Sequence, residues 1–400
     1  MATAMDIVPS PATLYVKNTE SKGKGLFSSA AIKEGATIFE EKPEIACQFS
    51  WNRQYNYTAC DNCMKSLETA QNMARRLTAD YDRELPYSDL CCDATKSRKN
   101  IVKCPRCMLS FCSSACFLEA EEKYHKFLCL GHDKNNNEHP LNKLEEEWRK
   151  IHYPPETASI MLISRMVSMI AQSPDPEKQL EKFNQFVSNV RDIDTKMTHK
   201  LLGEKFQGEL SRMYRLLKDA VPIEYYPKLL TMDGLKSLFA LIGMNGQGIG
   251  TSSLSQYVHN VDALQLEESE REKVDNIIDN LYDDIEKESG QFLNCEGSGL
   301  FELQSKCNHS CSPNAEVTFP YNNSTLVLVA LSDIEPNEEI CICYLDECQR
   351  DRSRHSRQKI LRENYLFECS CLRCEIESDQ QSVTSSDESD IQETGDYCDD

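Results

Sequence analysis

Long apolar runs are missing from this chain of 400 residues. No stretch approaches the roughly 18 uninterrupted apolar residues of a membrane-spanning helix, so we expect no membrane span. The first residues, MATAMDIVPSPATLYV, also lack a basic segment followed by a long apolar one, which is the pattern of a secretory signal. We therefore expect a cytoplasmic protein and leave entry into the nucleus open. With 40% apolar and 27% charged residues, the composition is that of an ordinary folded protein.

Basic residues are in deficit, because 44 Lys and Arg stand against 65 Asp and Glu and give a net charge of -21. Residues 378–400 contribute eight carboxylates and no Lys or Arg. This low-complexity segment is predicted to be a disordered acidic tail. The rest of the chain keeps a net charge of about -13, which argues against a protein that coats duplex DNA.

Cysteine is present in excess, with 20 residues in the chain. Without a secretory signal, this number indicates a reducing compartment and metal-bound thiolates rather than disulfides. Short spacings let one turn of backbone bring two ligands to a single zinc ion, and four ligands complete a tetrahedral site. Four such pairs follow one another, enough for two sites: Cys60 and Cys63, Cys104 and Cys107, Cys112 and Cys116, His125 and Cys129.

The order of these pairs resembles a MYND finger, whose ligand pairs interleave. The resemblance implies one zinc site formed by Cys60, Cys63, Cys112 and Cys116, and a second formed by Cys104, Cys107, His125 and Cys129. Two alternatives stay open. Cys91 or Cys92, in the unusually long insert of residues 64–103, could serve as a ligand, although reduced core or surface thiols are the favoured interpretation. His132 could replace His125, although the spacing from His125 to Cys129 favours His125.

A third set of cysteines lies in the sequence CSCLRC and comprises Cys369, Cys371 and Cys374. Three thiolates leave a tetrahedral zinc site one ligand short, so a partner must come from elsewhere. Cys311, in the sequence NHSC, is the best candidate. The prediction is then three zinc ions held by eleven cysteines and one histidine. The other nine cysteines need no metal role.

Two distant segments resemble the two halves of a SET domain. KGKGLF, from Lys22 to Phe27, and the following AAIKEGATIFEEKP resemble its beginning. NHSCSPN, EEICICY and CSCLRC resemble its C-terminal half with the post-SET zinc loop. SET halves that flank a MYND finger resemble the SET and MYND domain family of protein lysine methyltransferases. The long finger insert, the segment FLNCEGSGLF and the acidic end narrow the resemblance to one subtype of this family.

This resemblance implies an α+β fold, in which a β-rich SET fold is split by a two-zinc MYND finger and a helical insert. A zinc-bound post-SET loop and a disordered acidic C-terminal tail complete it. The implied boundaries are 12–56 for the N-terminal SET part, 57–132 for the finger, 141–290 for the helical insert, 291–348 for the catalytic SET core, 349–376 for the post-SET region and 377–400 for the tail.

The residues outside the motifs support further expectations. ETASIMLISRMVSMIAQ, ended by SPDP, is typical of an apolar helix within the insert. GMNGQGIGTSSL is expected to be a flexible glycine-rich loop, and it lacks the Gly-Lys-Ser/Thr sequence of a phosphate-binding loop. The basic run RDRSRHSRQKILR, from Arg350 to Arg362, is predicted to lie on the solvated face of a helix.

The resemblance further implies methyl transfer from S-adenosylmethionine to a lysine amine. The amine must be neutral, although its ordinary pKa is about 10.4, and a dry channel favours the neutral form because desolvation disfavours the ammonium. Tyr344 matches the family tyrosine beside the transferring methyl, and Tyr365 matches the second channel tyrosine. The remaining matches are to cofactor-binding residues: Phe367 on adenine, Lys22 and Lys24 near the cofactor carboxylate, Asn308 and His309 at its amino acid and adenosine.

The leading hypothesis is a protein-lysine N-methyltransferase that acts on histones or other proteins. The alternative is a zinc-dependent scaffold, whose finger binds proline-rich peptides while the SET fold is inert. The joint presence of Tyr344, Asn308 and His309 favours the enzyme. We expect neither a membrane nor specific DNA sequences as partners, because the order of the cysteines is not that of fingers that read the major groove.

Overall fold

The computed structural model describes residues 13–20, 22–92, 100–151, 159–186, 206–221, 231–289 and 294–379. The predicted acidic tail lies outside these residues from position 380 on. The chain divides into two compact units. The first unit comprises Met1–Glu41, Glu302–Thr318 and Leu326–Asp400, and the second comprises Lys42–Phe301 and Phe319–Thr325. None of the described helices has the length and apolarity that crossing a bilayer requires.

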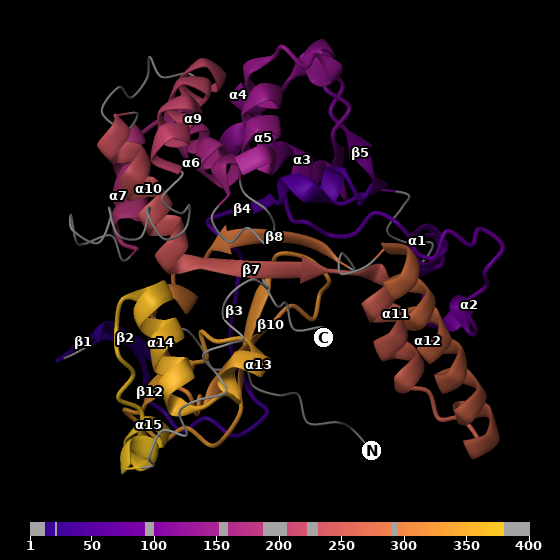
Figure 1. Cartoon of the computed structure of the whole chain (residues 1–400), viewed down its shortest axis with the longest axis vertical. Coiled ribbons are helices and arrows are strands. Elements are labelled where there is room, and N and C mark those ends of the chain that lie inside the picture. The colour runs from indigo at the N-terminus through magenta and orange to yellow at the C-terminus, as the bar shows by residue number, and fades with distance from the viewer. Residues whose placement is uncertain are drawn as a thin grey trace. The chain divides into compact units, whose positions relative to one another are not determined.

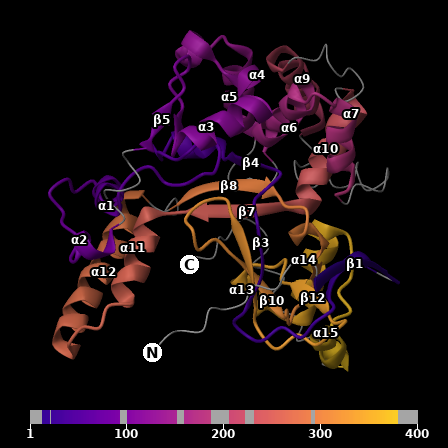
Figure 2. The same cartoon turned by 180° about the vertical axis from the view of Figure 1, so that it is seen from behind.

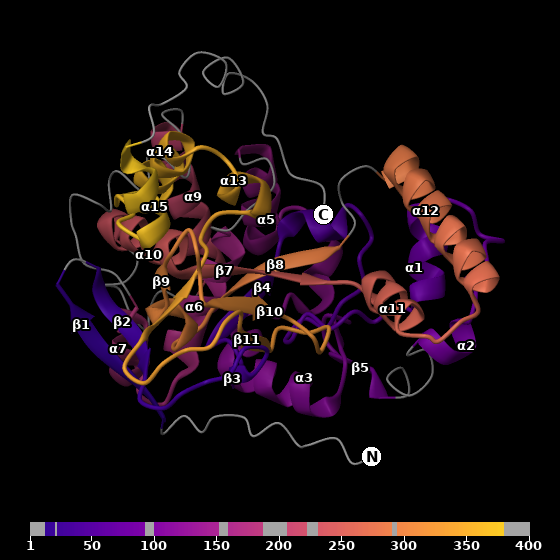
Figure 3. The same cartoon turned by 90° about the horizontal axis from the view of Figure 1, so that it is seen from below.

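The first unit contains two small sheets that join segments from both ends of the sequence. One has the strand order β1 (Leu14–Thr19), β2 (Gly23–Ser28), β12 (Glu339–Ile342) and β9 (Asn308–His309). Figure 3 shows β1 and β2 side by side. They pair antiparallel, and Thr19 lies opposite Gly23. The other sheet has the order β10 (Ala315–Thr318), β11 (Leu326–Ala330) and β3 (Thr37–Glu41).

Local chemistry explains why these strands pair as they do. The hairpin between β1 and β2 turns at Gly23, whose φ of 73° is a left-handed conformation that glycine adopts without strain. β12 pairs antiparallel with β2 and sets Ile340 opposite Leu26, and both side chains are fully buried. On its other edge β12 runs parallel to β9 and pairs Cys341 with Asn308.

The described part of the first unit also contains the α-helices α13 (Glu347–Arg350), α14 (Arg354–Tyr365) and α15 (Leu372–Ile376). The Ser353 hydroxyl caps α14 by accepting a hydrogen bond from the backbone N–H of Ser356. Leu366 ends this helix in a left-handed conformation with a φ of 61°. The basic run is therefore helical from Arg354 on, while Arg350 ends the preceding helix α13. The expected solvated face is wrong for one residue, since Arg357 is completely buried.

The second unit is built around a sheet with the order β4 (Ile45–Gln48), β8 (Cys295–Leu300) and β7 (Gly246–Thr251). β7 is the segment that the sequence led us to expect as a flexible loop. Instead all six of its residues pair with β8 (Figures 1 and 2). Backbone pairing needs no side chains, so the glycines of β7 do not prevent it. Only the partner strand is tight at a glycine, because a Cβ at Gly297 of β8 would clash with the Cys47 carbonyl and with Met64, whereas nothing lies within 4 Å of a Cβ at Gly248.

Helices fill most of the second unit. Trp148 stacks on Phe239 with ring centroids 5.7 Å apart, and together with Met166 and Met213 they lie in the main core. The helices are α3 (Ser114–Ala120), α4 (Lys126–Leu128), α5 (Pro140–Ile151), α6 (Ile160–Gln172), α7 (Pro176–Asn184), α9 (Phe206–Ala220) and α10 (Met232–Asn245), and a short hairpin pairs β5 (Val102–Lys103) with β6 (Ser110–Phe111).

The long insert packs against a helical pair of the same unit. Its helices α1 (Ala70–Leu77) and α2 (Ser88–Cys91) lie against α11 (Ser253–Asp262) and α12 (Glu268–Ser289), as Figures 1 and 2 show. They share a separate core that includes Met73, Leu77, Tyr257 and Leu281. Cys91 is buried in this core, which agrees with its interpretation as a reduced thiol.

Candidate active site and metal clusters

Two tyrosines of the first unit lie side by side, and the hydroxyl of each is held by a backbone carbonyl. Tyr344 follows β12, and its hydroxyl donates a hydrogen bond to the carbonyl of Cys307 at 2.7 Å. Tyr365, the last residue of α14, donates from its hydroxyl to the carbonyl of Tyr344 at 3.1 Å. Their ring centroids lie 5.0 Å apart. The two predicted channel tyrosines are therefore neighbours with fixed hydroxyl directions.

Two further predicted residues border this pair. His309 accepts a hydrogen bond at Nδ1 from the backbone N–H of Tyr344 at 3.0 Å, so the ring is fixed against the strand end. Phe367 lies just beyond the left-handed turn at Leu366, and its ring centroid is 5.9 Å from that of His309 and 6.3 Å from that of Tyr344. Four rings thus pack against one another and form an apolar aromatic cluster at this end of the unit.

Burial keeps the titratable groups of this region uncharged. It raises the pKa of Tyr365 to about 12 and raises that of Tyr344 further above its ordinary value. Burial also lowers the pKa of His309 to about 4, so that its imidazole is neutral at pH 7. A region that disfavours charge on its own side chains also disfavours charge on an amine placed there.

The predicted cofactor residues Lys22 and Asn308 meet at a carboxylate that sequence reasoning missed. The Lys22 ammonium donates to Glu339 Oε2 at 2.9 Å, and the Asn308 amide donates to Glu339 Oε1 at 2.7 Å. Lys24 lies beside them only through its backbone, since its carbonyl accepts from the Asn308 amide at 3.2 Å, while its side chain is exposed. Glu339 belongs to the EEICICY motif, so the sequence contained a signal that could have identified it as a site residue.

The third set of cysteines gathers in the same unit. The sulfur atoms of Cys311, Cys369, Cys371 and Cys374 all lie within 4.8 Å of one another. The Cys311 sulfur is 3.6 Å from that of Cys374 and 4.0 Å from that of Cys369. The structure thus brings Cys311 to the three cysteines of CSCLRC, as the need for a fourth ligand predicted.

Two arginines of α14 lie against this cluster. The buried guanidinium of Arg357 has Nη2 at 3.8 Å from the Cys374 sulfur and donates from Nη2 to Glu377 at 2.6 Å. Arg354 donates to the carbonyl of Cys374 at 2.8 Å. The basic run therefore lies where thiolate charge would gather.

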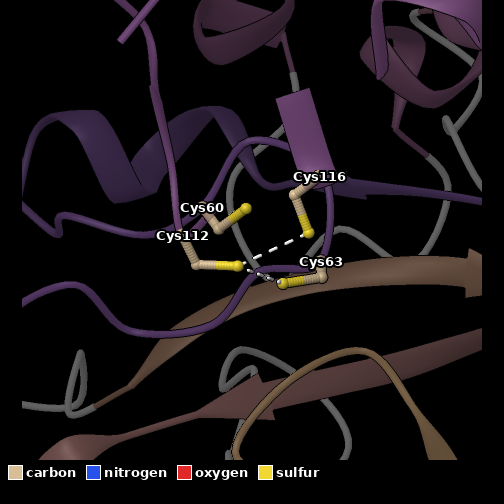
Figure 4. Close-up of side chains that lie close together, drawn as sticks. All are labelled: Cys60, Cys63, Cys112 and Cys116. Atoms are coloured by element: carbon tan, nitrogen blue, oxygen red, sulfur yellow. Dashed lines mark hydrogen bonds between the residues drawn. The ribbon is translucent and has the colours of Figure 1, made fainter. Parts of the chain in front are cut away.

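The second unit holds the two other ligand groups. Cys60, Cys63, Cys112 and Cys116 form one of them, and Figure 4 shows their side chains converging from separate parts of the chain. Cys104, Cys107, His125 and Cys129 form the other. Neither group includes Cys91, Cys92 or His132 among the residues that the structure describes. The two groups interleave along the sequence in the order that the MYND resemblance implied.

The spacing within all three groups fits zinc. A tetrahedron with zinc–sulfur bonds of about 2.3 Å has edges of about 3.8 Å between sulfur atoms. The observed sulfur separations are 3.6 Å for Cys63 and Cys112, 3.4 Å for Cys112 and Cys116, and 3.8 Å for Cys104 and Cys129. Cys107 lies 3.6 Å from His125 Nε2. Sets of three or four thiolates are also the donors that zinc prefers in structural sites.

Comparison with known proteins agrees with this arrangement. The SET domain family model matches residues 23–345. A human and a chicken protein, both named Protein-lysine N-trimethyltransferase SMYD5, are each 53% identical to the chain over 367 and 371 residues, which is 92% of this chain and 87% of each relative. A mouse Histone-lysine N-methyltransferase SMYD3 is 40% identical over 92 residues, which cover 23% of this chain and 20% of that protein.

Proposed function

This chain belongs to the SET domain protein-lysine methyltransferases of the SMYD5 type, and we propose that the aromatic region of its first unit transfers methyl groups from S-adenosylmethionine to lysine side chains of proteins. The observation that supports this most directly is the packing of the rings of Tyr344, Tyr365, Phe367 and His309 into one cluster. Asn308 directly precedes His309 on β9 and shares the Glu339 carboxylate with Lys22. The proposed substrates are histones and other proteins with accessible lysines.

The chain's own residues would act by position and by desolvation. S-adenosylmethionine supplies, when bound, a methyl group on a positive sulfur that an uncharged amine can attack in line. Tyr344 and Tyr365 keep their hydroxyls on backbone carbonyls, so neither phenol competes as a proton donor. The apolar aromatic cluster disfavours the ammonium form of the substrate lysine. Lys22 and Asn308 offer an ammonium and an amide to the amino-acid end of the cofactor, and Phe367 offers an apolar face to its base.

The cysteine clusters would hold three zinc ions, two in the finger and one in the post-SET region. Their role is structural, since each group has four protein ligands and leaves no open position for a substrate. Cys311 lies two residues after His309, so the third ion would anchor the segment that contributes the imidazole. Zinc binding would thus stabilise the site without taking part in the reaction.

Two finer properties extend this proposal. The SMYD5 relatives are named trimethyltransferases, and we propose that this chain also adds three methyl groups. A second activity, peptide binding by the finger, is supported by two exposed apolar side chains, Met108 at 52% and Leu118 at 63% exposure. Its proposed ligands are proline-rich peptides. The cytoplasmic location stays a prediction from the sequence.

The test incubates the zinc-loaded protein with radiolabelled S-adenosylmethionine and fractionated cell protein, and then locates and counts the methyl groups by mass spectrometry. Label on lysine supports the enzyme, and trimethyllysine supports the finer proposal. Tight cofactor binding without transfer to any fraction would favour the scaffold instead. Binding of a labelled proline-rich peptide, compared between the native chain and Leu118→Asp, tests the finger separately.

A further inference from the structure

We propose that Glu339 is a positioning residue of the cofactor pocket, which orients the Asn308 amide and holds the Lys22 ammonium for the amino-acid end of S-adenosylmethionine. This inference rests on the proposed function, because it assigns a role within the same pocket. It adds a residue whose part in the site follows from the contacts of its side chain.

Both oxygens of the Glu339 carboxylate are engaged, one by Asn308 of β9 and the other by Lys22, which directly precedes β2. Oε1 accepts from Asn308 Nδ2 at 2.7 Å, and Oε2 accepts from Lys22 Nζ at 2.9 Å. The Glu339 side chain is only 19% exposed and that of Lys22 is 33% exposed, so water screens the pair less than on an open surface. Burial is the largest single influence on Lys22 and opposes its charge, but the hydrogen bond to Glu339 and the attraction of nearby negative groups together outweigh it, so that the pKa of Lys22 is raised.

The carboxylate fixes which way the Asn308 amide points. An ionised carboxylate can only accept hydrogen bonds, so the amide must turn its nitrogen toward Glu339. The second hydrogen of that nitrogen goes to the carbonyl of Lys24 at 3.2 Å. Both amide hydrogens are then used. The amide oxygen, Oδ1, is left as an acceptor, and the cofactor's α-ammonium group is a donor of matching chemistry.

Strand order explains why one side chain can reach both partners. Glu339 begins β12, which lies between β2 on one edge and β9 on the other. It pairs with Phe27 of β2, and Asn308 belongs to β9. Glu339 is therefore the link between the two distant segments that contain the predicted cofactor residues.

Gly25 supplies the space for this link. A Cβ at Gly25 would lie 2.7 Å from Glu339 Oε1 and 3.1 Å from Asn308 Nδ2. The first distance is shorter than van der Waals contact allows, so any larger residue would displace the carboxylate from the amide. The glycine in KGKGLF thus makes room for a protein contact, in addition to any close approach by the cofactor.

Substitution of Glu339 should weaken the binding only of ligands that carry the amino-acid end of S-adenosylmethionine. Glu339→Gln keeps an acceptor for Asn308 but loses the charge that holds Lys22, and Glu339→Ala loses both contacts. We expect Glu339→Gln to weaken S-adenosylmethionine binding about tenfold, as for the loss of one charge-assisted hydrogen bond, and Glu339→Ala to weaken it further. Binding of 5′-methylthioadenosine, which lacks the amino acid, should change less than about twofold in either variant.

The measurement is calorimetric titration of the zinc-loaded proteins with each ligand, alongside thermal unfolding. Glu338→Gln is the matched control, because this neighbour contacts Asn314 at 3.0 Å and the backbone of Glu335 at 2.8 Å rather than the pocket. It should leave both affinities unchanged. If the Glu339 variants lose affinity for both ligands equally, or keep native affinity for both, the positioning role is wrong. If the native chain itself fails to bind S-adenosylmethionine, the proposed function fails first.

Discussion

The Tyr344 hydroxyl donates to the carbonyl of Cys307 at 2.7 Å, and Cys307 directly precedes the β9 residue Asn308. This hydrogen bond ties the phenol to the segment that contains the predicted cofactor residues. Removing the hydroxyl should therefore affect transfer more than folding. For Tyr344→Phe we expect a loss of methyl transfer of about a hundredfold or more, since a misplaced reacting group has consequences of that size.

Cofactor affinity and stability separate this outcome from general damage. Loss of one buried hydrogen bond should lower the free energy of unfolding by about 1 kcal/mol, and calorimetric cofactor binding should change only a few-fold. Tyr15→Phe is the control, because Tyr15 lies on β1 of the same unit and its hydroxyl contacts Asn337 at 3.1 Å. A Tyr344→Phe enzyme that retains native turnover would show that this phenol is only a packed aromatic side chain.

The pH dependence of transfer follows from the buried phenols. Burial raises the pKa of Tyr365 to about 12 and that of Tyr344 higher still, so both stay protonated up to pH 10. The substrate lysine has an ordinary pKa of about 10.4 and becomes reactive as it loses its proton. We therefore expect kcat/KM to rise with pH from 7 to 10 with no falling limb from the tyrosines. A decline that Tyr365→Phe abolishes would contradict the assignment.

Gly25 offers a test of packing beside the pocket. Gly25→Ala places a Cβ 2.7 Å from Glu339 Oε1, and the neighbours must move apart. Overpacking of this kind costs about 1–3 kcal/mol, so we expect S-adenosylmethionine binding to weaken by about tenfold or more. Gly248→Ala is the control, because no heavy atom lies within 4 Å of the place that its Cβ would take. This variant should bind S-adenosylmethionine with the affinity of the native chain. Equal affinities for the two variants would show that the carboxylate moves aside at no cost.

Short spacings made the metal clusters predictable from the sequence. Within a turn such as Cys104 to Cys107, two ligands must lie close together whatever the rest of the chain does. Motifs with fixed chemistry, such as NHSC, likewise placed Asn308 and His309. The fourth ligand Cys311 could be predicted because a tetrahedral site needs four donors.

Features that depend on tertiary contacts were not predictable in the same way. Three of the six residues of β7 are glycines, which are rare in strands, and its pairing partner β8 is more than 40 residues away. Arg357 looked solvated because a charged helix usually is, and its burial depends on tertiary partners: the Cys374 sulfur, the Glu377 carboxylate and the Arg352 carbonyl. Glu339 stood in the EEICICY motif, yet its two partners become visible only when the strands are ordered.

The insert should support the stability of the second unit. Met73 is 1% exposed and lies in the core that α1 and α2 share with α11 and α12. For Met73→Ala we expect a loss of about 2–5 kcal/mol in the free energy of unfolding, as for other buried methionines. Denaturation in urea measures this loss of stability, and Tyr81→Ala is the control because the Tyr81 side chain is exposed. A loss below about 1 kcal/mol would show that the insert is not part of a stabilising core.

Arg357 should slow the release of zinc from the third cluster. Four thiolates around one zinc ion leave a net negative charge, and the guanidinium faces it while donating to Glu377 at 2.6 Å and to the Arg352 carbonyl at 2.6 Å. A lysine ammonium is a point donor and cannot span these partners at once. For Arg357→Lys we expect faster release of one of the three ions to a chromophoric chelator, and a free energy of unfolding lower by about 2 kcal/mol.

Arg362→Lys is the control. Arg362 lies on the same helix but forms a half-exposed ion pair with Glu368, so this variant should release zinc as the native chain does. Identical release curves for the two variants would mean that the thiolates need no buried cation, and that the basic run stabilises only the fold around them.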